Sequence, residues 1–137
     1  MASYEHCNHE KFKIRYHIIF STKYRRKLLG SIMDDIKTSM KRAEAVQNNW
    51  SIEVMEIDTQ KCDHIHFLIR ATPTCQVSEI IHKLKQISTY DMWQKHNQYL
   101  SKFYRSGKHY LWTKGYFCAT IGDVSEKTPQ VYIENQG

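Results

Sequence analysis

The stretch Phe12–Ser21 reads FKIRYHIIFS. Apolar side chains occupy every second position from Phe12 to Phe20, and polar side chains such as Lys13, Arg15 and His17 fall between them. Because alternate side chains of a strand point to opposite faces, this pattern predicts a β-strand with one face on a core.

Further elements follow this strand. They are a helix from Gly30 to near Asn49, strands over Trp50–Ile57 and Cys62–Arg70, a helix from Val77 to near Asn97, a strand over Tyr116–Ile121 and a short terminal helix from Thr128. Apolar residues at helical spacing support the two longer helices, and Thr128-Pro129 is a helix-start signal. The order β-α-β-β-α-β predicts an α+β fold, ferredoxin-like or RRM-like. It has a four-stranded antiparallel sheet, helices on one face and an added C-terminal helix.

Composition limits the class of protein. The 137 residues suit a single domain, 1–137, with residues 1–10 as a flexible tail. A net charge of +6 and an isoelectric point near 9.1 favour a polyanionic partner. The sequence contains neither a long apolar run nor a signal-peptide core, so we expect no membrane association and a soluble, cytoplasmic protein. Four widely spaced cysteines are expected to be reduced.

A histidine pair, His64 and His66, lies inside the predicted strand Cys62–Arg70. On a strand both imidazoles project to one face, about 6.5 Å apart along the backbone at ~3.3 Å per residue. Such a pair suits a divalent cation that keeps open coordination positions, as catalytic centres do. The alternative is a pair of polar side chains on the solvent face of a half-buried strand.

The predicted terminal helix carries a second candidate group. Tyr132 and Gln136 are four residues apart and lie on one stripe, whereas Pro129 and Ile133 define a neighbouring stripe that packs on the core. Tyr132 is therefore expected to face outward. Its phenol, with a pKa of about 10, needs a nearby cation to act as a nucleophile. Packing of Tyr132 against a neighbour is the alternative.

Basic and aromatic residues gather in three segments. They are Lys23, Tyr24, Arg25, Arg26 and Lys27; Lys83 and Lys85 on the second helix; and Lys102, Arg105, Lys108 and Lys114 among Tyr104, Tyr110 and Trp112. Basic side chains pair with phosphates, and aromatic rings stack on unpaired bases. The first two segments supply the candidate DNA-binding residues.

Several blocks, in order along nearly the whole chain, resemble the small single-tyrosine HUH transposases of the IS200-like insertion-sequence group. These blocks are Tyr16–Phe20, Lys23–Lys27, Asp63–Leu68, Leu111-Trp112, Gly115–Phe117 and Tyr132–Gln136.

The resemblance implies a DNA transposase that cleaves and rejoins single-stranded DNA at hairpin-bearing element ends. Tyr132 would attack the scissile phosphodiester and form a 5′-phosphotyrosine intermediate. His64 and His66 match the family's metal ligands and Gln136 its third ligand, with Mg²⁺ or Mn²⁺ as the ion. The family also implies a homodimer, in which the tyrosine helix can serve the partner's histidine pair, and a location at the prokaryotic nucleoid when DNA is bound.

Other functions stay open. A non-catalytic nucleic-acid-binding module on the same fold would explain the charge and the aromatic residues, but it leaves the histidine pair and Tyr132 without a role. A domesticated relative that no longer moves an element is compatible with every residue. A histidine-triad nucleotide hydrolase is disfavoured, because Leu68 stands where the alternation requires a third histidine.

Overall fold

The computed structural model describes residues 12–122 and 130–133. Its elements are β1 (Ile14–Ser21), the 3-10 helices η1 (Lys23–Arg25) and η2 (Leu29–Ile32), α2 (Met33–Ala45), β2 (Trp50–Ile57), β3 (His64–Ala71), α3 (Val77–Lys95), α4 (Asn97–Ser101), β4 (Phe117–Gly122) and β5 (Gln130–Ile133). The predicted tail, 1–10, and Thr128-Pro129 lie outside the described residues.

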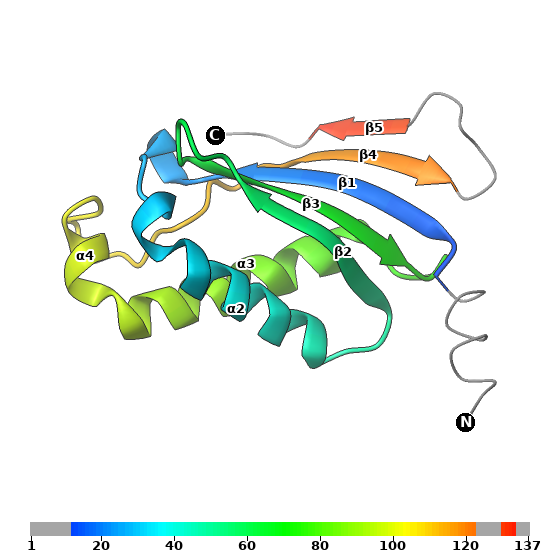
Figure 1. The fold of residues 1–137 in the computed structure, drawn as a ribbon, viewed down its shortest axis with the longest axis horizontal. Helices are drawn as coiled ribbons and strands as arrows, with labels where there is room; N and C mark the ends of the chain where they lie inside the picture. Colours follow the sequence, from blue (N-terminus) through cyan, green and yellow to red (C-terminus); the bar gives the residue numbers. More distant parts are fainter. Residues whose placement is uncertain (1–11, 123–129, 134–137) are drawn as a thin grey trace.

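The described strands form one antiparallel sheet, in the order β2-β3-β1-β4-β5. Helices α2 and α3 lie side by side against one face of this sheet, and within residues 12–122 and 130–133 no helix lies on the other face (Figure 1). The predicted α+β class, with the order β-α-β-β-α-β and helices on one face, is confirmed.

The core lies between the sheet and the two helices. Burial alternates along β1 and β3, and the register pairs the buried Ile18 of β1 with the buried Phe67 of β3. Ile80 and Leu84 of α3 are also fully buried. Each such side chain stabilises the fold by roughly 1.5–3 kcal/mol through removal of apolar surface from water. The opposite face of β1 and β3 is left to half-buried residues, His17 and His66 among them.

Polar contacts fix the two helices against each other. Asp91 of α3 accepts hydrogen bonds from Ser39 Oγ at 2.7 Å and from Arg42 at 2.7 and 3.0 Å, both on α2. Near the other end of α2, Asp35 contacts Lys95 and His96 at 2.9 and 2.7 Å. Among the described segments, no helix has the length and apolar character required to cross a membrane.

The predicted terminal helix is wrong over residues 130–133, which form β5 and add a fifth strand to the sheet. The register pairs Tyr132 with Cys118 of β4. Val131, Tyr132 and Ile133 are β-branched or aromatic residues, which suit a pleated strand, and β4 would otherwise leave its edge open. Over residues 130–133, pairing with the edge of β4 therefore outweighs the local helix-start signal.

Candidate metal centre

The two histidines of β3 lie together on the face of the sheet opposite α2 and α3. His64 and His66 alternate with the buried Ile65 and Phe67, whose packing in the core fixes the strand. The imidazole centroids are 5.1 Å apart, with an angle of 58° between the ring planes. Both histidine side chains are half-buried. The core packing of the strand therefore holds them in place, and solvent can still reach them.

Asp63 fixes the orientation of His64. The Nδ1 atom of His64 lies 2.8 Å from Asp63 Oδ1, and Arg25 Nε donates to Asp63 Oδ2 at 3.1 Å. Burial acts to raise the pKa of Asp63, but the hydrogen bonds from His64 and Arg25 outweigh it and lower that pKa. Asp63 is therefore a carboxylate that accepts a hydrogen bond from Nδ1–H of His64, which leaves Nε2 of His64 as the metal-binding nitrogen.

His17 of β1 contacts the Nδ1 atom of His66, as Asp63 contacts that of His64. Its Nε2 lies 3.4 Å from His66 Nδ1, and the two rings stack at 5.6 Å with a 22° interplanar angle. Burial lowers the pKa of His66, and repulsion from His64 and His17 lowers it further. His66 is thus neutral near pH 7, the form that binds a metal ion.

Carboxylates complete the surroundings of the pair. Ligand atoms of Asp58, Asp63 and His64 all lie within 4.8 Å of one another, and the register places Glu56 of β2 opposite His66. Imidazole nitrogens mixed with carboxylate oxygens suit a hard or borderline divalent cation such as Mg²⁺ or Mn²⁺. The residues present therefore fit the ion that the sequence predicts. Neither Asp58 nor His17 was a predicted site residue. The register of β1 with β3 places His17 beside the pair, and the turn between β2 and β3 places Asp58 there.

The structure does not bring Tyr132 next to these histidines within one chain. Ile18 pairs with Phe67 on β3 and with Cys118 on β4, and Cys118 in turn pairs with Tyr132. Three strand spacings of about 4.8 Å, roughly 14 Å in all, therefore separate the backbone of Tyr132 from Phe67, the neighbour of His66. Gln136 lies outside the described residues.

Lys85, a predicted DNA-binding residue, has a structural role. Its ammonium donates hydrogen bonds to the carbonyl oxygens of Thr113, Lys114 and Gly115 at 2.7, 3.0 and 3.0 Å. Burial lowers the pKa of Lys85 to about 8. All three N–H groups of the ammonium bind the loop that precedes β4. A phosphate that paired with Lys85 would have to displace these hydrogen bonds. The helical pattern placed Lys85 on a polar face, but it could not show that a loop covers that face.

The other predicted DNA-binding residues are accessible to different extents. Tyr24, Arg25, Arg26 and Lys27 are exposed, whereas Lys23 and Lys83 are half-buried. The segment that begins at Lys23 is attached to the centre, since Thr22 N donates to the Asp63 carbonyl at 2.9 Å.

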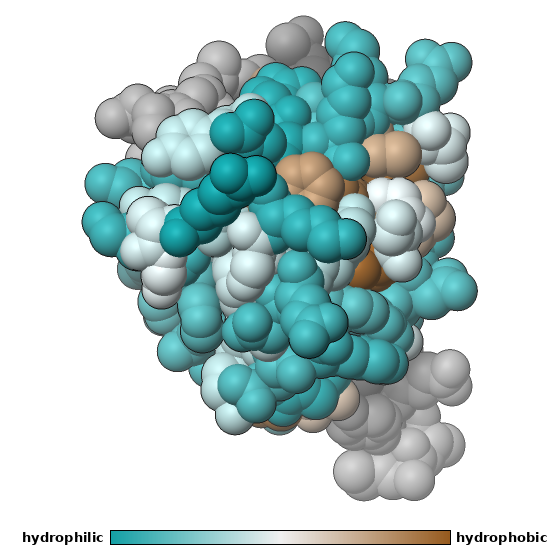
Figure 2. Space-filling view, turned by 90° about the vertical axis from the view of Figure 1, so that its left-hand side faces the viewer, coloured by the Kyte–Doolittle hydropathy of each residue, from teal (hydrophilic) through white to brown (hydrophobic). Residues whose placement is uncertain are grey.

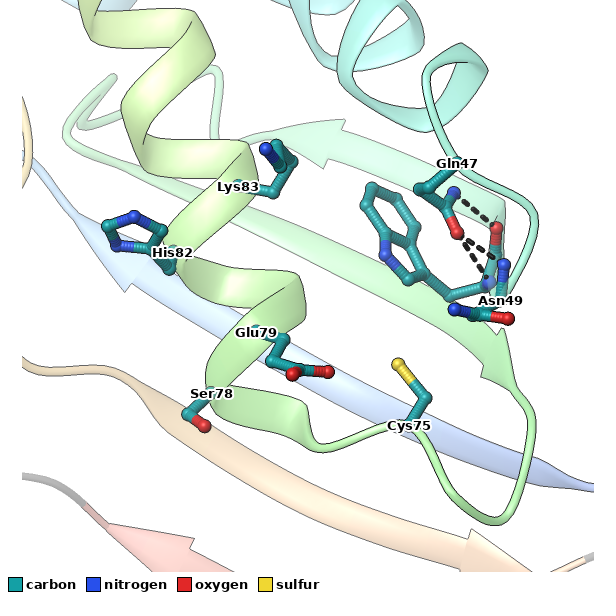
Figure 3. A pocket seen from close by; sticks show the side chains of 8 residues that line it. Gln47, Asn49, Cys75, Ser78, Glu79, His82 and Lys83 are labelled. Atoms are coloured by element: carbon teal, nitrogen blue, oxygen red, sulfur yellow. Dashed lines mark hydrogen bonds between the residues drawn. The ribbon is translucent and has the colours of Figure 1, made fainter.

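A separate cavity of about 640 Å³ lies at the other end of β3, between the start of α3 and the start of β2 (Figure 3). Its lining residues are Gln47, Asn49, Trp50, Cys75, Ser78, Glu79, His82 and Lys83. The Gln47 side chain bonds the backbone of Trp50 there, and burial raises the pKa of the Cys75 thiol. Because Cys75 follows the end of β3 and His64 begins it, this cavity is not part of the histidine centre.

Residues 10–136 match the family described as "Transposase IS200 like". The chain is 30% identical over 126 residues to the ISDra2 transposase TnpA of Deinococcus radiodurans, covering 91% of this chain and 85% of the relative. It is also 30% identical over 129 residues to the transposase for insertion sequence element IS200 of Salmonella typhimurium, covering 93% and 80%.

Solved structures with the same architecture were also found. A transposase structure from Deinococcus radiodurans R1 superposes with a TM-score of 0.66 at 28% identity, over 84% of this chain and 82% of that one. The REP-associated tyrosine transposase bound to a REP hairpin gives a TM-score of 0.55 at 12% identity, over 81% and 57%. The second match shows a shared fold alone.

Proposed function

Because the chain belongs to the IS200-like transposase family, we propose that it cleaves and rejoins single-stranded DNA through Tyr132 in a metal-dependent reaction. The observation that carries the proposal is the paired orientation of His64 and His66, whose Nδ1 atoms are engaged by Asp63 and His17. A nucleic-acid-binding module without chemistry has no need of two histidines held in this way.

His64 and His66 would hold Mg²⁺ or Mn²⁺ through Nε2, with Gln136 as a third ligand and the carboxylates of Asp58 and Asp63 close by. When bound, such an ion supplies polarisation of the scissile phosphate. Asp63 keeps His64 in the required tautomer, and the low pKa of His66 means that no proton has to leave it near pH 7.

Tyr132 is the proposed nucleophile. Its phenolic oxygen attacks the scissile phosphorus, and the bond between that phosphorus and the 3′ oxygen breaks. The upstream part of the strand leaves with a 3′-hydroxyl, whose proton replaces the one lost by the phenol, and the 5′ phosphate of the downstream part stays on the tyrosine. No water is consumed, so attack by a 3′-hydroxyl on the phosphotyrosine rejoins the strand.

We further propose that the working form is a homodimer with composite sites. The roughly 14 Å between the backbone of Tyr132 and that of Phe67, the neighbour of His66, supports delivery of the tyrosine to a partner's histidines, or a rearrangement of the terminal segment. Hairpin DNA is the proposed substrate, by analogy with the REP-associated tyrosine transposase that was solved on a REP hairpin. For such a protein we expect a cytoplasmic location, at the nucleoid when it is bound to DNA.

A cleavage assay tests the proposal. Single strands that carry the imperfect palindromes flanking the gene are incubated with the full chain and Mn²⁺, and covalent complexes are resolved on denaturing gels. We expect a protein–DNA adduct that disappears with chelator, with His64→Ala and with Tyr132→Phe. Metal-dependent binding of these strands without any adduct would instead favour the non-catalytic binding module or a domesticated relative.

A further inference from the structure

Two basic aromatic segments, far apart in the sequence, form one pocket of about 560 Å³. It is lined by Tyr24, Arg26, Lys102, Phe103, Tyr104, Arg105, Ser106 and Tyr110. The pocket belongs to the end of the molecule where η1 and α4 lie (Figure 1), and hydrophilic side chains dominate the surface of that end (Figure 2). In the sequence the two segments form separate clusters.

Three tyrosines form the aromatic part of this pocket. The ring centroid of Tyr24 lies 6.4 Å from that of Tyr104 and 6.2 Å from that of Tyr110, and Tyr104 and Tyr110 are 5.9 Å apart. Tyr104 is buried, and its hydroxyl donates to the Lys23 carbonyl at 2.8 Å. Tyr24, in contrast, is 63% exposed. The inner rings therefore fix the position of an outer ring that faces solvent.

Cations surround these rings. Lys23 Nζ lies 5.3 Å from the Tyr24 centroid and 5.2 Å from that of Tyr110. Arg26 lies 5.8 Å from Tyr24, and Lys108 lies 6.0 Å from Tyr110. Lys102 and Arg105 add two more charges to the lining, and none of the described lining residues is acidic. An anion with an aromatic or planar part fits this combination better than a purely apolar ligand.

The backbone that carries Tyr24 is strained. Tyr24 and Arg25 have φ values of 61° and 54°, in the left-handed region that side chains with a Cβ rarely adopt. Neighbouring bonds enforce this conformation: Thr22 Oγ1 donates to the Arg26 carbonyl at 2.7 Å, and Lys23 N donates to the Leu111 carbonyl at 2.8 Å. Strain that the surroundings impose in this way is concentrated at functional sites.

We propose that this pocket binds one unpaired nucleotide of a single DNA strand, with its base stacked on Tyr24 and its phosphate paired with Arg26, Lys102 or Arg105. The inference deepens the proposed function and rests on it for the identity of the nucleic acid. Arg25 connects the pocket to the metal centre, because it bonds Asp63, which in turn bonds His64. A nucleotide in the pocket would thus lie close to the strand held at the histidines.

Binding of a labelled oligothymidylate to the full chain, followed by fluorescence anisotropy at fixed salt, tests the pocket. Tyr24→Asn removes the ring while asparagine tolerates the left-handed backbone, so the variant should fold. We expect its affinity to fall roughly tenfold, and Tyr24→Phe to bind like the wild type. The matched control is Tyr90→Gln, since Tyr90 on α3 is 61% exposed, and it should bind like the wild type.

A photocrosslink supplies a second readout. An oligonucleotide with 5-iodouracil at successive positions should crosslink to Tyr24 or Tyr110, as mapped by mass spectrometry. Wild-type affinity of Tyr24→Asn, an equal loss in Tyr90→Gln, or crosslinks only to other segments would overturn the proposal.

The two proposals fail in different ways. If the wild type forms the Tyr132 adduct and Tyr24→Asn binds DNA unchanged, the pocket is wrong and the transposase chemistry stands. If Tyr24 is required for binding but the flanking strands give no adduct, the pocket stands and the chemistry is wrong.

Discussion

Asp63 Oδ1 lies 2.8 Å from His64 Nδ1, and this contact determines which nitrogen of the histidine remains for a metal ion. The same carboxylate accepts a hydrogen bond from Arg25, which follows Tyr24 in the strained segment. One buried carboxylate therefore connects the candidate metal centre to the proposed nucleotide pocket.

The first prediction concerns this carboxylate. Asp63→Asn replaces the acceptor with an amide that can present either an oxygen or an NH₂ group, so His64 loses its fixed tautomer. We expect Mn²⁺ affinity to fall by about 10–100-fold, the usual effect of losing such a partner. Isothermal titration calorimetry measures the affinity, with Asp34→Asn, an exposed acid at the start of α2, as the control. Unchanged Mn²⁺ binding by Asp63→Asn would show that Asp63 does not orient the ligand.

A second prediction concerns His17 as the partner of His66. His17→Phe keeps a ring beside His66 but removes the nitrogen that lies 3.4 Å from His66 Nδ1. Because that contact is long, we expect a loss of Mn²⁺ affinity near the low end of the range, about tenfold. His17→Gln should retain most of the affinity through its amide. Equal losses in both variants would point to a packing role instead.

Acid stability provides a third prediction, through Asp91. Burial acts to raise the pKa of Asp91, but the hydrogen bonds from Arg42 and Ser39 outweigh it and lower that pKa. The stabilisation is therefore fully present above the unfolded value of about 4 and is lost as the pH falls through the lower folded value. Asp91→Asn should reduce the free energy of unfolding by about 1–2 kcal/mol at pH 7.

Urea unfolding at several pH values measures this effect. The difference between the wild type and Asp91→Asn should shrink below about pH 4. Glu79→Gln, on the exposed side of the same helix, should change the free energy of unfolding by at most about 0.5 kcal/mol. A difference for Asp91→Asn that does not vary with pH would contradict the assigned pKa shift.

The fourth prediction separates two lysines of α3. Lys85→Met leaves the carbonyls of Thr113, Lys114 and Gly115 without their donor, so the free energy of unfolding should fall by about 1–3 kcal/mol. Lys83→Met should leave stability nearly unchanged. At a temperature where both variants are folded, affinity for single-stranded DNA should be no lower for Lys85→Met than for Lys83→Met. The reverse order would instead support Lys85 as a direct DNA contact.

Period-two patterns in the sequence were sufficient to predict β1, β3 and the common face of His64 and His66, because they report directly which face of a strand is buried. The terminal helix was predicted wrongly over residues 130–133, since Thr128-Pro129 is a local signal, whereas pairing with the open edge of β4 depends on the tertiary structure. The contacts of Lys85 could not be predicted for a similar reason: the loop that binds its ammonium group is almost thirty residues away.

Other parts of the site depend on pairing between strands and loops. His17 reaches the histidine pair through the register of β1 with β3, and Asp58 through the turn that joins β2 to β3. The pocket around Tyr24 depends on the approach of Tyr104 and Tyr110. Sequence spacing carries no information on such contacts, although the unusual density of basic and aromatic residues in both segments was visible.

Mass spectrometry of the protein after reaction with its flanking single strand and Mn²⁺ tests the central claim most directly. The account predicts a proteolytic peptide containing Tyr132 that carries a nucleotide through a phosphate on the phenolic oxygen, and its loss with chelator. Unmodified Tyr132 in protein that has cleaved the strand, or a nucleotide attached to any other residue, would contradict it.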